Sequence, residues 1–232
     1  IFDGHEGRLV AKIDQFFDDY EPHLTRLRRD DVRVLEIGIS GGGSLELWRS
    51  YFGPTASIHG VDLDPAAVAN APEDSIAHLG SQTDRELLLS IVEEHGPFDF
   101  IIDDGSHQVE HQIETFEILY PTMVDNGLYI CEDAFSSYWP VYGGGLRRPG
   151  TFVEYAKDKI DELHAWWRDG DSVPTGAFAA TTRSITFLSG AVLFERVVRP
   201  APRYELRANS ASHSMSIEEL HEAARDHVGL ES

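Results

Sequence analysis

Residues 34–44 read VLEIGISGGGS, an apolar strand that runs into a glycine-rich turn. The apolar and β-branched residues Val32–Ile37 predict the strand, and Ser44–Phe52 beyond the glycines predict a helix. Glycines at such a turn let a ligand come close to the backbone, and the free N–H groups at the helix start attract negative groups. The motif therefore predicts a ligand-binding turn at the edge of a sheet.

Strands and helices alternate beyond this turn. The sequence predicts strands at residues 57–62, 75–79, 98–103 and 127–132, and helices at residues 65–70, 84–94 and 109–120. This order is typical of a parallel sheet with helices on both faces. Two further strands, at residues 179–188 and 191–198, flank Ser189 and Gly190, which favour a tight hairpin turn. We expect an α/β, doubly wound, Rossmann-like fold with a mostly parallel seven-stranded sheet and a terminal antiparallel hairpin.

The two ends of the chain fall outside this alternation. Apolar residues at helical spacing from Leu9 through Ile13 to Leu27 predict a helix, a break near Pro22 and a second short helix. Ser216 and Glu219 form a capping box that predicts a final helix over residues 216–227. We expect a single domain made of an N-terminal helical segment (1–30), a core (31–198) and a C-terminal extension with a helix (199–232).

The composition excludes several classes of partner. The chain has 232 residues, with 19 Lys plus Arg against 40 Asp plus Glu and a formal net charge of −21. Because nucleic acids and anionic membranes attract basic surfaces, we expect neither as a partner. The chain has one cysteine, Cys131, and no apolar run of the roughly 18 residues that span a membrane. We therefore expect a cytoplasmic protein.

The glycine turn suits a nucleoside cofactor. The dinucleotide pattern G-x-G-x-x-G needs glycine at position 40, where this chain has serine. An acid at position 36 suits a positively charged cofactor such as S-adenosylmethionine, because a carboxylate can hold its methionyl ammonium group. The predicted cofactor contacts of the turn are Glu36, Gly38, Ser40, Gly42 and Ser44. The alternative is an ordinary strand–helix turn without a ligand.

The next two strand ends predict the remaining cofactor contacts. Asp62 follows the turn by roughly 20 residues, the spacing at which an acid accepts ribose hydroxyls. Ser81 and Gln82 lie where an adenine edge is expected, although Thr83 or Asp84 can instead cap the following helix. We add Asp103, at the end of the fourth strand, as a further cofactor contact.

Acids and a histidine follow the fourth and fifth strands. The motif DDGSH occupies residues 103–107, and the pair Glu132-Asp133 ends the next strand. The carboxyl ends of parallel strands share one edge of the sheet, so these groups are expected to meet beside the glycine turn. Crowded carboxylates raise one another's pKa, and a hard cation such as Mg²⁺ relieves the repulsion. Asp104, Glu132 and Asp133 can supply three ligands, and His107 is a candidate base. The alternative is that these acids cap a helix or face solvent.

Together these motifs resemble class I S-adenosylmethionine-dependent methyltransferases. The resemblance is strongest to the metal-dependent sugar O-methyltransferases of macrolide and other glycosylated natural products, such as the mycinamicin and macrocin O-methyltransferases. It covers residues 32 to about 198 and is carried by VLEIGISGGGS, GVDLDP (60–65), IIDDGSH (101–107), the acid pair with SYWP (137–140), and TRSI (182–185). Serine at position 40 departs from the common glycine loop, and the segment before Asp30 matches poorly.

The resemblance implies the fold of class I methyltransferases, S-adenosylmethionine and Mg²⁺ as cofactors, and a role in antibiotic biosynthesis. It further implies that Asp104, Glu132 and Asp133 bind Mg²⁺, with His107 as general base beside Asp104 in the catalytic centre. The expected acceptor is a sugar hydroxyl of a glycosylated small molecule, and a homo-oligomer is expected.

The aromatic loop at residues 134–150 is a candidate wall of the acceptor site. Its length is typical of functional loops, and Tyr138, Trp139 and Tyr142 are its candidate substrate contacts. An ordered surface loop is the alternative.

Other functions remain open at this point. The acceptor can be a catechol or a nucleotide-linked sugar. An NAD-type oxidoreductase and a non-catalytic nucleotide-binding module are alternatives of another class. A zinc pair formed by His107 and His111 lacks thiolates and the H-E-x-x-H arrangement.

Overall fold

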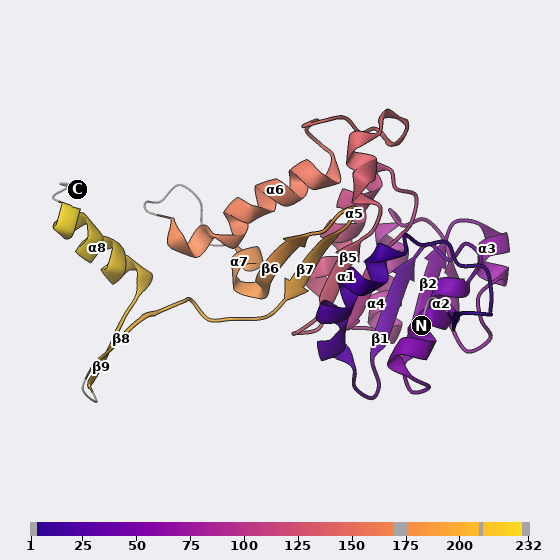
Figure 1. Ribbon diagram of the computed structural model, residues 1–232, viewed down its shortest axis with the longest axis horizontal. Coiled ribbons are helices and arrows are strands. Elements are labelled where there is room, and N and C mark those ends of the chain that lie inside the picture. The colour runs from indigo at the N-terminus through magenta and orange to yellow at the C-terminus, as the bar shows by residue number, and fades with distance from the viewer. Residues whose placement is uncertain (1–3, 169–175, 209–210, 229–232) are drawn as a thin grey trace.

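The computed structural model describes residues 4–168, 176–208 and 211–228. In this described part, seven strands form one sheet in the order β3-β2-β1-β4-β5-β7-β6 (Figure 1). Strands β1 to β5 run parallel, β7 is antiparallel to β5, and β6 is antiparallel to β7. The expected doubly wound fold with a terminal hairpin is confirmed. The strands are β1 (Arg33–Ile37), β2 (Ser57–Asp62), β3 (Ile76–Leu79), β4 (Phe100–Asp103), β5 (Leu128–Cys131), β6 (Thr182–Phe187) and β7 (Val192–Arg196).

Helices cover both faces of this sheet. Neighbouring strand residues such as Val34 and Leu35 point to opposite faces, and both are fully buried because each face carries helices. The core on the side of Leu35 includes residues of α4 (Arg85–His95), α5 (Val109–Leu119) and α6 (Phe152–Leu163). The core on the side of Val34 includes residues of α1 (Gln15–Leu24), α2 (Gly43–Phe52) and α3 (Pro65–Ala69). Short 3₁₀ turns follow or link these helices at Thr25–Leu27, Tyr120–Thr122, Ala134–Tyr138, Pro140–Tyr142 and Ala165–Trp167.

The strand order reverses at the centre of the sheet, where β1 lies between β2 and β4. The loops after β1 and β4 leave in opposite directions, and ligands of open α/β sheets bind in the crevice between such loops. The two loops touch at Gly38, which has a φ of +95°. A Cβ at this position would lie 2.2 Å from the carbonyl oxygen of Asp104. The glycine of the turn is therefore required by close backbone approach as well as by its φ.

The N-terminal segment differs from the sequence prediction at Pro22 and before the start of α1. The predicted break at Pro22 is wrong, because α1 continues through Pro22 to Leu24. Phe16, Tyr20 and Leu24 are buried against the sheet, and this packing outweighs the backbone hydrogen bond that proline removes. Leu9 and Ile13 lie before the helix rather than on its apolar stripe.

The C-terminal part also differs from the sequence prediction. Helix α7 (Ala177–Thr181) occupies the start of the predicted strand at residues 179–188. The sequence analysis missed a separate hairpin, β8 (Tyr204–Ala208) and β9 (Ala211–Met215). Helix α8 (Ile217–Val228) begins at the predicted capping box, in which Ser216 N donates to Glu219 Oε2 at 2.6 Å and Glu219 N donates to Ser216 Oγ at 3.2 Å.

Figure 1 shows that β8, β9 and α8 lie away from the main sheet, at the end of the extended segment that follows β7. Across the described ranges, none of the helices is both long and apolar enough to span a membrane.

Candidate active site

A cavity of about 520 Å³ lies at the carboxyl edge of the parallel strands. Its walls come from the segments after β1, β2, β3, β4 and β5, together with residues 9–12 of the N-terminal segment. Many of the predicted site residues line it, namely Gly38, Ser40, Ser44, Asp62, Ser81, Gln82, Asp104, His107 and Asp133. The topology thus brings together side chains that are up to about a hundred positions apart in the sequence.

Asp62 holds the glycine turn in shape. Its Oδ2 accepts the backbone N–H groups of Ile39 at 2.8 Å and Ser40 at 3.1 Å, and its Oδ1 accepts that of Asp64 at 2.8 Å. Ser40 has a φ of +49°, a left-handed conformation that these bonds support. A carboxylate offers about four acceptor positions, so Asp62 retains capacity for a ribose hydroxyl.

Gln82 joins the loops after β3 and β4. Its Nε2 donates to Asp103 Oδ1 at 3.1 Å and to Thr115 Oγ1 at 3.0 Å, and its Oε1 accepts the N–H of Ser106 at 2.7 Å. Burial raises the pKa of Asp103 to about 7, and the neighbouring Asp104 adds to the effect. Asp103 is almost fully buried, and its hydrogen bond with Gln82 connects the loops after β3 and β4 beneath the cavity surface.

Lys12 lies at the centre of the acidic cluster, a contact that the sequence analysis missed. Its Nζ is 2.6 Å from Asp104 Oδ2, 2.6 Å from Glu132 Oε2 and 3.4 Å from Glu36 Oε1. Glu36 also accepts a hydrogen bond from Trp48 Nε1 at 3.1 Å. The predicted cofactor contact Glu36 and the predicted metal ligand Glu132 are therefore both engaged by a cation of the same chain. One feature of the sequence could have indicated a buried lysine. Lys12, one of three lysines in the chain, stands among the apolar residues of VAKI (10–13).

Burial shifts the protonation of this cluster. Burial acts to raise the pKa of Glu132, and the positive charge of Lys12 acts to lower it. Burial also disfavours the Lys12 ammonium, but the three carboxylates raise the pKa of Lys12 well above its ordinary value. Lys12 is therefore the resident counter-ion of these acids.

A second group of ligand atoms lies beside Lys12. The candidate ligand atoms of Asp104, His107 and Asp133 all lie within 4.8 Å of one another. His107 Nε2 is 3.6 Å from Asp133 Oδ2, and in the described part of the chain the buried His107 Nδ1 has no hydrogen-bond partner. His107 and Asp133 have φ values of +57° and +50°. Such strained conformations of residues other than glycine cluster at functional sites.

These residues fit a divalent cation in part. Asp104 and Asp133 offer the hard oxygens that Mg²⁺ prefers. Glu132, the third ligand that the resemblance implies, is held by Lys12. Asp133 and the second oxygen of Asp104 can thus hold the ion directly. Asp104 Oδ2 and Glu132 Oε2, both 2.6 Å from Lys12 Nζ, can join them only when Lys12 moves.

The aromatic loop borders a second cavity of about 410 Å³. Tyr142 and Arg148 of the loop line it, together with His111 of α5, which also lines the first cavity. Tyr142 packs edge-on against His107, with ring centroids 5.8 Å apart, and stacks on Trp139 at 6.2 Å. Tyr138 and Trp139 are about half exposed. The loop therefore connects the acid–histidine group to a neighbouring space large enough for a ligand.

Comparison with known proteins agrees with this geometry. Residues 35–134 match the family model of a methyltransferase domain. The crystal structure of the methyltransferase MycE from the mycinamycin biosynthetic pathway, in complex with Mg and SAH, superposes with a TM-score of 0.74 at 31% identity. The match covers 82% of this chain and 51% of that chain. This chain carries a class I methyltransferase domain.

Two curated relatives are named as O-methyltransferases of glycosylated compounds. The 8-demethyl-8-(2-methoxy-alpha-L-rhamnosyl)-tetracenomycin-C 3'-O-methyltransferase of Streptomyces olivaceus is 46% identical over 180 residues, which are 69% of this chain and 45% of that protein. The L-olivosyl-oleandolide 3-O-methyltransferase of Streptomyces antibioticus is 41% identical over 171 residues, which are 69% of this chain and 44% of that protein. The chain thus spans about half the length of the curated relatives it matches.

The predicted cofactor, metal and catalytic residues divide into two sets. Those of the first set line the first cavity, where a ligand can reach them. Glu36, Gly42, Asp103 and Glu132 form the second set, which supports the walls. Gly42 is the N-cap of α2 and has a φ of +79°, and a Cβ there would lie 2.4 Å from the carbonyl oxygen of Asn70. Gly42 is thus required by the packing of the turn against the end of α3.

Proposed function

We propose that this chain transfers a methyl group from S-adenosylmethionine to a sugar hydroxyl of a glycosylated small molecule, with Mg²⁺ and with His107 as general base. The observation that carries the proposal is that one cavity holds both the glycine turn with Asp62 and the group formed by Asp104, His107 and Asp133. The names of the relatives, which methylate sugars on tetracenomycin and oleandolide, support the acceptor class.

The cofactor would lie along the carboxyl edge of the sheet. Asp62 would accept a ribose hydroxyl, and the open backbone at Gly38 would admit the cofactor close to the chain. Ser81 and Gln82 would lie beside the adenine. The sulfonium is positively charged, so the acids around Asp104 favour its presence at this end of the cavity.

Asp104 and Asp133 would hold Mg²⁺, and Glu132 would join them when Lys12 moves away. When bound, Mg²⁺ would supply Lewis acidity that lowers the pKa of an acceptor hydroxyl.

His107 would remove the proton of the acceptor hydroxyl at Nε2, the ring nitrogen that faces Asp133. The Asp133 carboxylate would stabilise the imidazolium that results. Tyr142 would hold the imidazole ring in place, and the second cavity would receive the acceptor sugar. Holding both reactants in adjoining cavities would supply much of the remaining rate enhancement.

The test is methyl transfer to a panel of rhamnosylated and olivosylated acceptors, with catechols and nucleotide-linked sugars alongside. We expect turnover of glycosides that stops with EDTA and returns with Mg²⁺. His107→Ala should lower kcat by about 100- to 10,000-fold with little change in cofactor affinity. Glu114→Gln, on the exposed side of α5, is the matched control and should leave turnover unchanged. Turnover that is insensitive to EDTA and to Asp104→Ala would exclude the metal role. Tight calorimetric binding of NAD without binding of S-adenosylmethionine would overturn the proposed function.

A further inference from the structure

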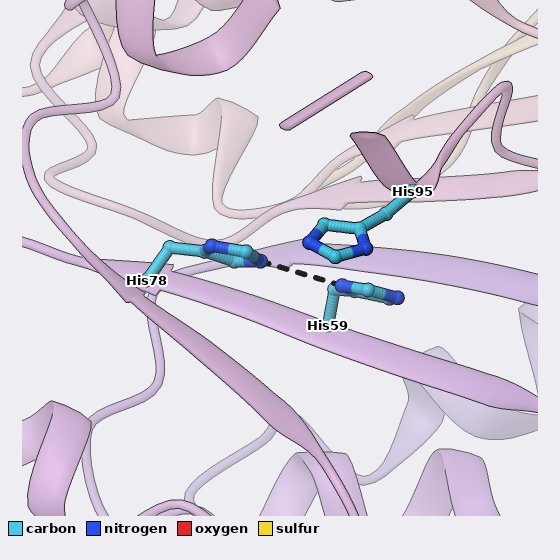
Figure 2. A group of neighbouring side chains, drawn as sticks. All are labelled: His59, His78 and His95. Atoms are coloured by element: carbon cyan, nitrogen blue, oxygen red, sulfur yellow. Dashed lines mark hydrogen bonds between the residues drawn. The ribbon is translucent and has the colours of Figure 1, made fainter. Parts of the chain in front are cut away.

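Three histidines from three separate elements meet on the face of the sheet that α4 covers. His59 lies in β2, His78 lies in β3, and His95 is the last residue of α4. Figure 2 shows their imidazole rings turned toward one another. These residues do not line the cavity described above, since two lie within strands and one ends α4, away from the loops at the carboxyl edge of the sheet.

The ring nitrogens are spaced as metal ligands. One nitrogen of each ring lies within 4.8 Å of those of the other two. His59 Nδ1 and His78 Nε2 are 3.3 Å apart. With Zn–N bonds of about 2.0–2.1 Å, two ligands of a tetrahedral site are about 3.3–3.4 Å apart. The His59 and His95 ring centroids are 4.7 Å apart, and those of His78 and His95 are 5.4 Å apart.

Ser57 can fix the tautomer of His59 in the metal-binding form. Its Oγ lies 2.8 Å from His59 Nε2 and can accept the proton of that nitrogen. The lone pair of His59 then lies on Nδ1, which faces His78. Metal-binding histidines typically donate their second ring N–H to an oxygen in this way, which fixes the ring and raises its basicity.

The surroundings favour a neutral, metal-binding form of these imidazoles. Burial lowers the pKa of His59 to about 4, and the neighbouring histidines and Arg33 add to the effect. Burial and His95 also lower the pKa of His78. His59 Nδ1 and His78 Nε2 also lie within hydrogen-bond distance of each other, so a bound ion would replace this hydrogen bond. The C-terminal end of α4, where His95 lies, carries the negative end of the helix dipole and favours a cation.

The site also has a wall and an entrance. Phe98 packs edge-on against His59 at 5.3 Å and closes the buried side. His78 and His95 are half-buried, and the Glu94 carboxylate lies 3.7 Å from His95 Nε2 on the exposed side. An ion can therefore reach the three nitrogens from solvent.

We propose that His59, His78 and His95 form a second metal site, separate from the active site, which binds a divalent transition metal such as Zn²⁺. Imidazole nitrogens select zinc over Mg²⁺, which prefers oxygen. The three ligands leave a fourth position for water. The ion ties β2, β3 and α4 together. Because β2 rises about 3.3 Å per residue, the ion lies roughly 10 Å along the strand from Asp62.

The test is Zn²⁺ and Co²⁺ binding to the chelator-stripped chain, followed by competition and by the visible spectrum of Co²⁺. The Asp104→Asn variant lacks one carboxylate of the active-site group. A zinc ion that still binds to this variant, at one per chain, therefore reports binding at the three histidines. We expect one such equivalent with a tetrahedral Co²⁺ spectrum. In the Asp104→Asn chain, His78→Ala should weaken zinc binding by at least about 100-fold. His78 is a direct ligand, and loss of a hydrogen-bond partner of a ligand alone already costs about 10- to 100-fold.

Two further variants keep the test sharp. Ser57→Ala leaves all three ligands in place and should weaken zinc binding by about 10- to 100-fold. His164→Ala, at an exposed histidine after α6, should bind zinc as the parent does. Zinc should also raise Tm in the Asp104→Asn chain and not in its His78→Ala derivative. The proposal is overturned if no zinc equivalent survives Asp104→Asn, or if His78→Ala and Ser57→Ala bind zinc as tightly as their parent.

Discussion

At the scale of single residues, Lys12 determines the state of the acidic cluster. Its ammonium is almost fully buried and contacts three carboxylates, two of which are themselves buried. Removing charges from water is unfavourable, so a buried group of this kind is tolerated only when its charges are paired. Lys12 and a divalent ion therefore compete for the same oxygens.

This competition predicts the behaviour of Lys12→Met. Without divalent ions the variant should lose about 3–5 kcal/mol of unfolding free energy, because buried carboxylates are left unpaired. Mg²⁺ should restore more stability to the variant than it adds to the parent, as measured by urea unfolding with and without the ion. Lys157→Met, which removes an exposed pair with Glu154, is the control and should cost at most about 1 kcal/mol. An equal response to Mg²⁺ in variant and parent contradicts the competition.

Gly38 offers a second test at this scale, with a matched control in the same chain. Gly38 and Gly53 have φ values of +95° and +93°, so alanine is strained at both positions. A Cβ at Gly38 meets the Asp104 carbonyl, whereas a Cβ at Gly53 meets open space. We expect Gly53→Ala to cost about 1–2 kcal/mol, and Gly38→Ala to cost more and to abolish S-adenosylmethionine binding. Calorimetric titration and thermal unfolding of both variants measure the difference, and equal behaviour of the two would contradict the role of loop contact.

At the scale of elements, an ionic contact attaches the N-terminal helix to the antiparallel edge of the sheet. Glu195 of β7 lies 3.3 Å from His23 Nδ1 of α1, 3.5 Å from Arg26 Nε and 3.7 Å from Arg183 NH1 of β6. Arg26 also donates to the carbonyl of Gly127 at 3.1 Å. The segment that carries Lys12 is thereby anchored at the far end of α1.

The contact predicts a pH-dependent stability. Burial acts to raise the pKa of Glu195, but the hydrogen bond from His23 and the charge of Arg26 lower it below its ordinary value of 4.5. A carboxylate with a lowered pKa in the folded state stabilises the fold above its unfolded pKa, and this stabilisation disappears as the pH falls through the folded pKa. Glu195→Gln should therefore cost about 1 kcal/mol at neutral pH and progressively less below about pH 4. Thermal unfolding of both chains across this range measures the difference, and a constant difference would exclude the ionic contribution.

Local sequence patterns predict some of the helices and strands correctly and fail for others. Strand β2 was predicted with its observed bounds, because the β-branched residues Ile58 and Val61 lie in a short segment between turn residues, which is a local signal. The arrangement of Asp62, Asp104 and Asp133 followed from topology, since parallel strands end at one edge. The break predicted at Pro22 failed because buried contacts outweigh a local preference.

Contacts between distant segments could not be read from local patterns. Lys12 meets Glu132 across 120 positions, and nothing near residue 12 specifies that partner. His59, His78 and His95 fall on two strands and a helix, and they meet only because β3 pairs with β2 and α4 packs over both. The hairpin at β8 and β9 follows two prolines in a polar stretch, where turn signals outweigh the strand pattern.

At the scale of the whole molecule, the chain divides into a packed body and an outlying C-terminal part. The main contacts of β8, β9 and α8 are with one another. By contrast, Val198 and Arg199 still bond to the body, through Asp125 and through Ala180 and Thr182. The boundary of the body therefore lies just beyond Arg199.

This boundary predicts the result of truncation. A chain that ends at Pro202 should keep the parent's unfolding free energy to within about 0.5 kcal/mol, since few contacts cross the boundary. A chain that ends at Val197 loses the three hydrogen bonds of Val198 and Arg199 and should unfold at a lower temperature. Differential scanning calorimetry distinguishes the two, and a large loss of stability at Pro202 would show that the C-terminal part supports the body.

The two cavities that share His111 have a kinetic consequence for the proposed reaction. Because they adjoin without coinciding, donor and acceptor can be bound at the same time, and the methyl group can pass directly from sulfur to oxygen. Initial rates measured against both substrates should then give intersecting double-reciprocal lines, the pattern of a ternary complex. Parallel lines would instead indicate a methylated form of the protein between two half-reactions.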